Sequence, residues 1–210
     1  MPEPQRLRIL LVGASGVLGR AIVAELSPRH DIVSAGSKSG DIRIDIANPA
    51  SIVAGLKAAG PLDAVACAAG AANWHPLSAI KLAGLEKSSY GLGLTNKLMG
   101  QVNLAVAARD HLNDRGSITL IAGVLSQTPI AAGSSASMVN AAVEAFTMAA
   151  AIEMPRGIRI NAVSPTVFEE SMADFGPFFR GHDAVPVVRA ARGFARSIEG
   201  LQTGQTFRMV

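Results

Sequence analysis

Hydrophobic and polar residues are arranged along this chain in two kinds of segment, short apolar runs and longer runs with helical spacing. Near the N-terminus, Leu7 and residues 9–12 form a nearly continuous apolar run, which is typical of a strand covered on both faces. Leu18, Ile22 and Leu26 then recur at helical intervals. The first unit is therefore predicted to be a buried strand followed by an amphipathic helix.

The same alternation continues to the end of the chain. Strands are predicted at 31–35, 42–46, 62–67, 117–122, 158–163 and 205–210, and helices at 49–59, 92–112, 135–154 and 187–198. This pattern predicts an α/β fold of Rossmann type, a doubly wound parallel sheet of about seven strands with helices on both faces. Only residues 36–41 separate the second and third strands, so we expect the crossover helix there to be missing or reduced to a turn.

Composition adds limits to this picture. The chain has 210 residues and is 49% hydrophobic, which fits a single domain over 1–210. Its one cysteine, Cys67, excludes a disulfide framework and a cysteine-based zinc site, and no metal is predicted. The net charge is only +3 and the basic residues are scattered, which argues against a nucleic-acid partner. With no basic-then-apolar leader and no apolar run of membrane-spanning length, we expect a soluble, cytoplasmic protein.

Three glycines, Gly13, Gly16 and Gly19, stand where the first strand gives way to the first helix. In a dinucleotide-binding loop the first glycine permits a tight turn, the second lets the backbone approach phosphate, and the third lets the helix pack against the strand. The free N–H groups at the helix start then face the anion. The spacing predicts a dinucleotide site, with a purely structural role for the glycines as the alternative.

The end of the second predicted strand, SAGSKSG, contains no acidic residue. A carboxylate at this point binds the ribose 2′-hydroxyl of NAD and repels the 2′-phosphate of NADP. Here Ser37 can donate a hydrogen bond and Lys38 can place a positive charge beside the phosphate. The segment favours NADP(H) over NAD(H), and the alternative is a solvated polar turn.

Several segments together resemble the short-chain dehydrogenase/reductase family over nearly the whole chain. They are GASGVLG at the cofactor loop, Asp45-Ile46 at the adenine contact, CAAGA, RGSITLIAG at the fifth strand, PRGIRINAVSP at the sixth, and TGQTF at the last. With the glycine loop and the Ser37-Lys38 turn, the resemblance implies cofactor contacts at Gly13, Ser15, Gly16, Val17, Leu18, Gly19, Ser37, Lys38, Asp45, Ile46, Ala68, Ala69, Gly70, Pro165, Thr166 and Val167. Thr166 stands where the family usually has glycine.

The usual catalytic residues of that family are missing from their expected positions. In the family a Tyr donates a proton to the substrate carbonyl as hydride arrives, a Lys lies one helical turn later, and an upstream Ser orients the carbonyl. Alignment of AAVEAFT with the family's helix puts Ala136 at the Tyr position, Asn140 at the Lys position and Gly123 at the Ser position. Lys97, in KLMGQ, stands where the family has Asn in an Asn-x-x-Gly pattern.

Two functions fit this pattern. The first is an NADP(H)-dependent oxidoreductase that transfers hydride to or from a small carbonyl, imine or quinonoid substrate, with Lys97 as the acid-base residue, aided by Ser126, Ser134, Ser135 or His75. An electrophilic substrate such as an iminium or quinone needs less help from an acid. The second is a noncatalytic NADP(H)-binding sensor or scaffold, in which Lys97 is a surface lysine.

The predicted helices 92–112 and 135–154 correspond to those that pair across two-fold axes in the resembling family. The second carries several alanines that allow close helix approach, namely Ala141, Ala142, Ala145, Ala149, Ala150 and Ala151. We therefore expect a homodimer or homotetramer. The alternative is that these alanines only face the protein's own sheet.

Overall fold

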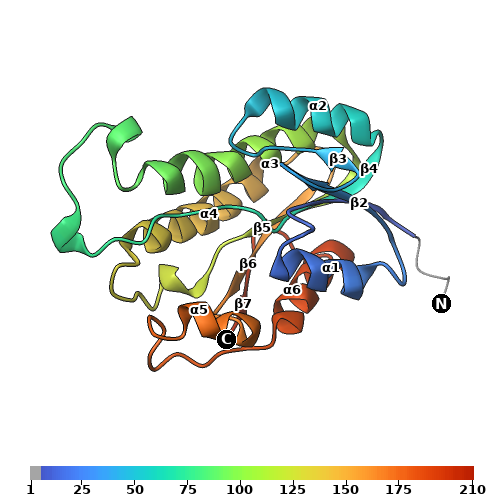
Figure 1. Cartoon of the computed structure of the whole chain (residues 1–210). Helices are drawn as coiled ribbons and strands as arrows, with labels where there is room; N and C mark the ends of the chain where they lie inside the picture. Colours follow the sequence, from blue (N-terminus) through green and yellow to red (C-terminus); the bar gives the residue numbers. More distant parts are fainter. Residues whose placement is uncertain (1–5) are drawn as a thin grey trace.

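The computed structural model describes residues 6–210, so residues 1–5 of the predicted domain lie outside the described part. Its parallel sheet has the order β3-β2-β1-β4-β5-β6-β7 (Figure 1), which confirms the predicted doubly wound fold. The strands are β1 (Arg8–Val12), β2 (Asp31–Gly36), β3 (Ile42–Arg43), β4 (Leu62–Cys67), β5 (Leu112–Ile121), β6 (Arg159–Pro165) and β7 (Thr206–Met209). The strand order reverses between β1 and β4, and ligands of such sheets bind outside the carboxyl ends of the strands at this reversal.

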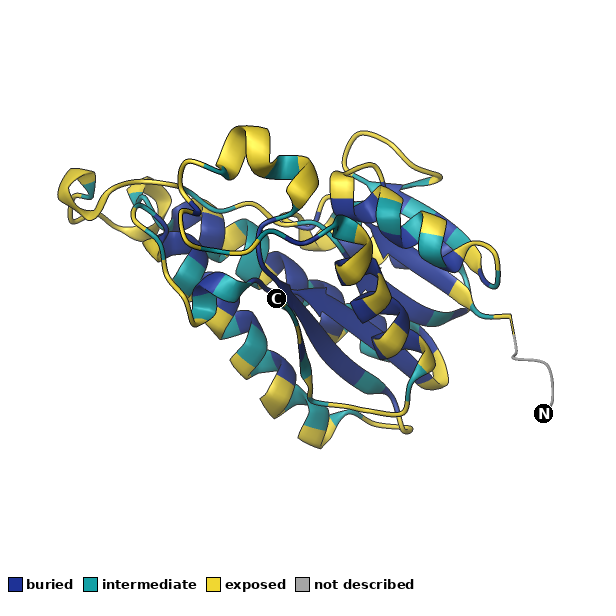
Figure 2. Cartoon of the chain, turned by 90° about the horizontal axis from the view of Figure 1, so that it is seen from below, coloured by how far each residue is buried: buried dark blue, intermediate teal, exposed yellow. Residues whose placement is uncertain are grey.

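Helices cover both faces of the sheet. Helices α2 (Pro49–Ala59), α3 (Met99–His111) and α4 (Ser134–Glu153) pack on one face, and α1 (Val17–Leu26) and α6 (Val187–Glu199) on the other. Because side chains alternate along a strand, Leu10 and Val12 of β1 face the first set of helices, whereas Ile9 and Leu11 face the second. Figure 2 shows the strands almost entirely buried and the outer helix surfaces exposed. This two-sided burial explains the continuous apolar runs in the sequence.

The connection between β2 and β3 lacks a helix, as predicted. Gly40 adopts φ +109°, and a Cβ there would lie 2.8 Å from the carbonyl oxygen of Ser34, so the turn folds back tightly onto the end of β2. The carboxylate of Asp41 accepts hydrogen bonds from the Ser34 hydroxyl at 2.7 Å and the Ser34 N–H at 2.9 Å. These bonds lower the pKa of Asp41. The turn is thereby held in one shape beside the sheet edge.

The strand β3 is shorter than the predicted 42–46, and the prediction was wrong there. The N–H of Asp45 donates to the Ser51 hydroxyl at 2.9 Å, and the side chain of Asn48 caps the first turn of α2. These local bonds turn the chain away from the sheet after Arg43. Ile44 and Ile46 still point into the core, which explains why the segment has the apolar pattern of a longer strand.

Two other predicted elements differ from the structure. The predicted helix 92–112 contains a π-helical segment, η3 (Gly93–Leu98), before α3 begins. The strand predicted at 117–122 starts earlier, at Leu112, because an irregular register against β4 shifts the pairing between Leu62 and Ala64. Arg115, with φ +64°, marks this irregularity. Residues in such an irregular segment do not alternate between apolar and polar, so the sequence pattern did not indicate the earlier start of β5.

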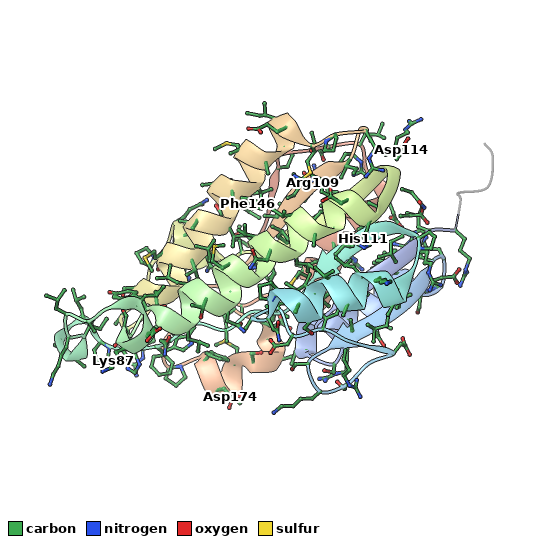
Figure 3. All side chains as sticks on the ribbon, turned by 90° about the horizontal axis from the view of Figure 1, so that it is seen from above. Lys87, Arg109, His111, Asp114, Phe146 and Asp174 are labelled. Carbon is green, nitrogen blue, oxygen red and sulfur yellow. The ribbon has the colours of Figure 1, made fainter. Side chains whose placement is uncertain are left out.

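The chain between β4 and η3 leaves the body of the domain as an arm of residues 71–92 (Figure 1). It contains the short 3-10 helices η1 (Leu77–Ala79) and η2 (Leu85–Lys87). Figure 3 labels Lys87 near the far end of this arm. Its leucines are exposed, among them Leu77 and Leu82.

Helix α4 corrects one expectation from composition. By length and hydropathy it could cross a membrane, although we expected no segment of that kind. It packs against β5, β6 and η4 (Val124–Ser126) in the described domain. Helices that cover a sheet meet the same criteria of length and composition, although only 33% of the apolar stretch of α4 is buried in this packing.

Candidate active site

Two adjoining hollows lie at the carboxyl ends of the strands near the reversal between β1 and β4. The polar hollow, of about 380 Å³, lies by β1 and β2, and the apolar cleft, of about 470 Å³, lies between β4, β5, β6 and α4. They share a wall formed by Ala69, Gly70 and Ala71, directly after β4. Together they make an elongated site whose two halves meet at this backbone.

The glycine loop lies at the junction. Gly13 has φ +89°, and a Cβ there would come within 2.9 Å of the backbone of Ala68 and Ala69. Gly16 caps α1, whose start carries no side-chain cap and no acidic residue in its first turn. Gly19 lies outside both hollow linings, and a Cβ on it would overlap the carbonyl oxygen of Gly13. The uncapped N–H groups of α1 therefore fit an anion such as a pyrophosphate.

The polar hollow contains most residues predicted for the adenosine half of a dinucleotide. They are Gly13, Ser15, Ser37, Lys38, Asp45, Ile46, Ala69 and Gly70. Ser39 and Asn96 also line it and were missed, since nothing in the sequence set them apart from a solvated turn and a helix surface. Asn96 holds the shared wall in place, because its Oδ1 accepts a hydrogen bond from the N–H of Ala71 at 2.8 Å.

The turn after β2 presents no carboxylate to this hollow. Asp41, the one acidic residue between β2 and β3, bonds to Ser34 and does not line the hollow. Ser37 and Lys38 do line it and are exposed. The turn itself therefore contributes a positive charge to the hollow, and the hollow's carboxylate is that of Asp45, after β3.

Six further predicted cofactor residues line the apolar cleft, whereas Gly16 lines neither hollow. The six are Val17, Leu18, Ala68, Pro165, Thr166 and Val167. Thr166 is buried and its N–H donates to the carbonyl of Met209 at 3.1 Å. Its backbone therefore continues the pairing of β6 with β7 into the cleft wall.

Lys97 extends from the π-helical segment η3 into the apolar cleft. Its Nζ donates a hydrogen bond to the carbonyl of Ala122, at the end of β5, at 3.1 Å. A Cβ at Gly70, which has φ +143°, would lie 2.9 Å from the Cγ of Lys97. The glycine therefore leaves room for the lysine side chain. Burial lowers the pKa of Lys97 to about 8, and interaction with Cys67 opposes this effect. Cys67 itself remains a neutral thiol, because burial raises its pKa to about 11.

The other catalytic candidates lie away from Lys97. The hydroxyl of Ser126 donates to the Glu144 carboxylate at 2.8 Å, and that of Ser134 lies 3.2 Å from the hydroxyl of Tyr90. Ser135 is buried beside Gly93, and His75 is exposed on the arm. None of these side chains is part of the cleft lining. The structure therefore brings Lys97 into the cleft without the partners considered for it.

The three positions aligned with the family's Ser, Tyr and Lys do meet in the apolar cleft. Gly123, Ala136 and Asn140 all line it. A Cβ at Gly123 would lie 2.8 Å from Nδ2 of Asn140, so these two residues are in direct contact. The cleft thus contains a glycine, a methyl group and an amide at these positions.

Four aromatic side chains form part of the cleft lining. Trp74 from the arm and Phe175 from α5 (Met172–Phe175) lie with ring centroids 6.1 Å apart at an interplanar angle of 51°. Phe168 and Phe179 are the other two. This side of the cleft is therefore largely apolar, and the cleft lining also includes polar residues, among them Lys97 and Asn140.

Comparison with known proteins shows to which family this chain is related. A sequence model of a family described as enoyl-(acyl carrier protein) reductase matches residues 17–192. The chain belongs to the short-chain dehydrogenase/reductase family. Members of this family bind a nicotinamide cofactor, and the chain is an oxidoreductase of this family. No protein with curated annotation matches it.

Solved structures of this family superpose along nearly the whole chain. Protein lin1944 from Listeria innocua is 43% identical, with a TM-score of 0.93, over 97% of this chain and 100% of that one. A small-chain dehydrogenase in complex with NADPH is 21% identical, with a TM-score of 0.82, over 98% and 97%. A short-chain dehydrogenase/reductase from Serratia marcescens is 22% identical, with a TM-score of 0.77, over 97% and 95%. At 21% and 22% identity, the last two matches show a similar fold and nothing further.

Proposed function

We propose that this short-chain dehydrogenase/reductase is a soluble, cytoplasmic NADP(H)-dependent oxidoreductase in which Lys97 serves as the acid-base residue. Its substrate is a small carbonyl, imine or quinonoid compound. The observation that carries the proposal is the ammonium group of Lys97 inside an apolar cleft, with its pKa lowered to about 8 by burial. A group that titrates near neutral pH can both give and take a proton.

The residues around both hollows fit a nicotinamide dinucleotide. The polar hollow would hold the adenosine half, the start of α1 the pyrophosphate, and the apolar cleft the nicotinamide between Pro165, Thr166 and Val167. When bound, the reduced cofactor supplies a hydride to an electrophilic carbon of the substrate. The shared wall at Gly70 lets a single extended ligand occupy both halves.

Lys97 supplies the proton that balances the hydride. As hydride reaches the substrate carbon, the double-bond electron pair moves to the carbonyl oxygen or imine nitrogen, which takes a proton from the ammonium. Lys97 is left as a neutral amine and regains a proton from solvent. In the reverse direction the neutral amine accepts the proton of the substrate hydroxyl. The aromatic side chains of Trp74, Phe168 and Phe175 line the cleft and favour an apolar substrate.

A second candidate function rests on the residues at the aligned catalytic positions. With Gly123, Ala136 and Asn140 in the cleft, the chain could bind NADP(H) as a noncatalytic sensor or scaffold. Loss of NADPH absorbance during incubation with a panel of carbonyl, imine and quinone compounds distinguishes the enzyme from the sensor. Turnover supports the enzyme, whereas tight NADPH binding without turnover on any compound supports the sensor.

We expect NADPH to bind at least several-fold more tightly than NADH. The turn after β2 offers Ser37 and Lys38 to the 2′-phosphate, while Asp41 is held by Ser34. An exposed contact between lysine and phosphate is worth roughly 1 kcal/mol, which corresponds to about a fivefold difference in affinity. Lys38→Ala should therefore narrow the gap between the two dissociation constants measured by calorimetry.

The control for this experiment is Lys57→Ala, which removes the same charge from the exposed surface of α2. It should leave the ratio of the two dissociation constants unchanged. Equal affinities for NADPH and NADH in the unaltered protein would contradict the assignment of NADP(H).

We also propose that the protein forms a homodimer or homotetramer through α3 and α4. Both helices expose large apolar side chains, among them Val106 on α3 and Met148 and Ile152 on α4, the last 85% exposed. Arg109 and Phe146 flank the groove between the two helices (Figure 3). Contiguous apolar surface of this kind is typical of subunit interfaces.

Light scattering at micromolar concentration should therefore give at least twice the 21.6 kDa chain mass. Ile152→Asp should shift the mass toward that of the monomer, because it places a charge on the proposed interface. Val53→Asp, an exposed apolar position on α2, serves as the control and should not change the mass. A monomeric mass for the unaltered protein would contradict this proposal.

A further inference from the structure

One oxygen of the Glu144 carboxylate joins two segments that are far apart in the sequence. Its Oε1 accepts a hydrogen bond from the Ser126 hydroxyl at 2.8 Å and another from the Ser164 hydroxyl at 2.9 Å. Glu144 lies on α4, Ser126 ends η4 and Ser164 belongs to β6. We call these two bonds the Glu144 bridge. Bonds from a hydroxyl to a carboxylate are roughly twice as strong as bonds between neutral groups, so the bridge ties the three elements together.

The bridge lies just beyond the point where the pairing of β5 with β6 ends. The last backbone bond between these segments runs from the N–H of Ala122 to the carbonyl of Val163, at 2.9 Å. In the described part of the chain, no backbone hydrogen bond joins residues 123–128 to another element. The bond from Ser126 to Glu144 is therefore the hydrogen bond that holds η4 to the rest of the domain.

Both segments that the bridge joins contribute to the lining of the apolar cleft. Val124 and Leu125 directly precede Ser126, and Pro165 directly follows Ser164. The three side chains of the bridge are not part of this lining themselves. The end of β6 is also held by its pairing with β7, so the bridge attaches the less secured η4 to a fixed strand end.

We propose that Glu144 is a positioning residue, whose carboxylate sets the separation between η4 and the end of β6 and thereby the geometry in which hydride and proton are transferred in the cleft. The inference rests on the proposed function. Lys97 bonds through Nζ to the carbonyl of Ala122, next to Gly123, where η4 begins. A shift of η4 therefore displaces the acceptor that holds the acid-base residue. Glu144 touches no reacting atom and moves no proton.

Two substitutions at 144 separate the bridge from the bulk of the side chain. Glu144→Leu removes the acceptor, whereas Glu144→Gln keeps it, because an amide oxygen also accepts two hydrogen bonds. Single-turnover oxidation of bound NADPH by the most active compound of the carbonyl, imine and quinone panel measures the effect. We expect the rate to fall about tenfold in Glu144→Leu, since small displacements of reacting groups are costly, and to recover in Glu144→Gln.

Ser126→Ala removes the other end of the same bond and leaves Glu144 in place. It should slow the reaction to a similar degree, because it also releases η4. In the double variant with Glu144→Leu the two effects should not add, since both changes remove one contact. Fully additive effects would overturn the proposal.

Hydrogen exchange of the peptide that covers residues 123–128 tests the bridge without any cofactor. The N–H groups of Gln127 and Thr128 bond to the carbonyl of Val124 within this turn, so they are protected while the turn is held. We expect faster exchange in Glu144→Leu than in the unaltered protein, and unchanged exchange in Glu144→Gln.

Asp63→Leu is the matched control. The Asp63 carboxylate also bridges two segments, because it accepts the N–H of Arg8 and the side-chain amide of Asn113, each at 2.8 Å. It lies near the amino end of β4 and lines neither hollow. Both Leu substitutions leave donors unpaired and should lower the free energy of unfolding, but only Glu144→Leu should slow the reaction.

Three results would overturn the positioning role of Glu144. They are faster exchange in Glu144→Leu with an unchanged rate, exchange that does not change at all, and a Glu144→Gln variant as slow as Glu144→Leu. Equal slowing in Asp63→Leu would likewise assign the effect to lost stability. If the unaltered protein oxidises NADPH with no compound of the panel, the proposed function fails, and the exchange experiment still decides whether Glu144 holds η4.

Discussion

Lys97→Met is expected to slow hydride transfer about 100-fold or more, the usual scale for loss of a positioned acid or base. Lys97 brings the only titratable side chain among the described residues that line the apolar cleft. Single-turnover oxidation of bound NADPH by an active substrate measures the effect. The rate of reduction in the unaltered protein should be level below pH 8 and fall above it, because the ammonium is the proton donor and its pKa is about 8.

The same substitution should stabilise the fold. Burial disfavours the charged form of Lys97, so its removal should raise the free energy of unfolding at pH 7 by about 2 kcal/mol, after allowance for solvent screening. The folded chain binds this proton less tightly than the unfolded chain, whose pKa is near 10.5. The free energy of unfolding of the unaltered protein, relative to that of the variant, therefore rises between pH 8 and pH 10.5. Above pH 10.5 the Met variant is no longer the more stable protein.

Lys87→Met provides the control, since Lys87 is exposed on the arm. It should leave the rate unchanged and the stability within about 0.5 kcal/mol. Unchanged turnover in Lys97→Met would contradict the acid-base role and favour a substrate that is electrophilic by itself. A variant that is less active but more stable is expected when the replaced residue serves function at a cost in stability.

Gly19→Ala is expected to destabilise the protein by about 3 kcal/mol and to weaken NADPH binding at least tenfold. The added methyl group would overlap the carbonyl oxygen of Gly13 and lie 2.7 Å from Cα of Ala14. Both neighbours are backbone atoms of the turn that we propose faces the pyrophosphate, so the turn must shift. For a chain of this length the melting temperature should fall by about 6–12 °C in a thermal unfolding experiment.

Gly84→Ala is the matched control on the arm. Gly84 has φ −65° and a Cβ there would meet nothing within 4 Å. Its replacement should change stability by no more than about 0.5 kcal/mol and should not affect NADPH binding. A melting temperature for Gly19→Ala equal to that of Gly84→Ala would refute the packing role of Gly19.

The sequence alone determined the layered fold and the location of the cofactor loop. Apolar runs such as 9–12 and 62–67 are continuous because helices cover both faces of the sheet, and burial of that kind leaves a clear signal in composition. The order of strand, glycine triplet and helix is equally local. The end of β3 could not be predicted, because hydrogen bonds of Asp45 and Asn48 decide it while the apolar pattern continues to Ile46.

Only the tertiary structure decided which polar residues share the cleft. Lys97, Gly123 and Asn140 lie on three different elements, and in the sequence only the resemblance to the family relates them, not the pattern of apolar and polar residues. Ser126 and His75 were equally plausible by residue type, yet Glu144 holds the first and the arm carries the second away. Secondary structure follows from neighbours in sequence, whereas a site forms where strand ends meet in space. The burial that lowers the pKa of Lys97 and the hydrogen bonds of the Glu144 bridge therefore exist only in the folded chain.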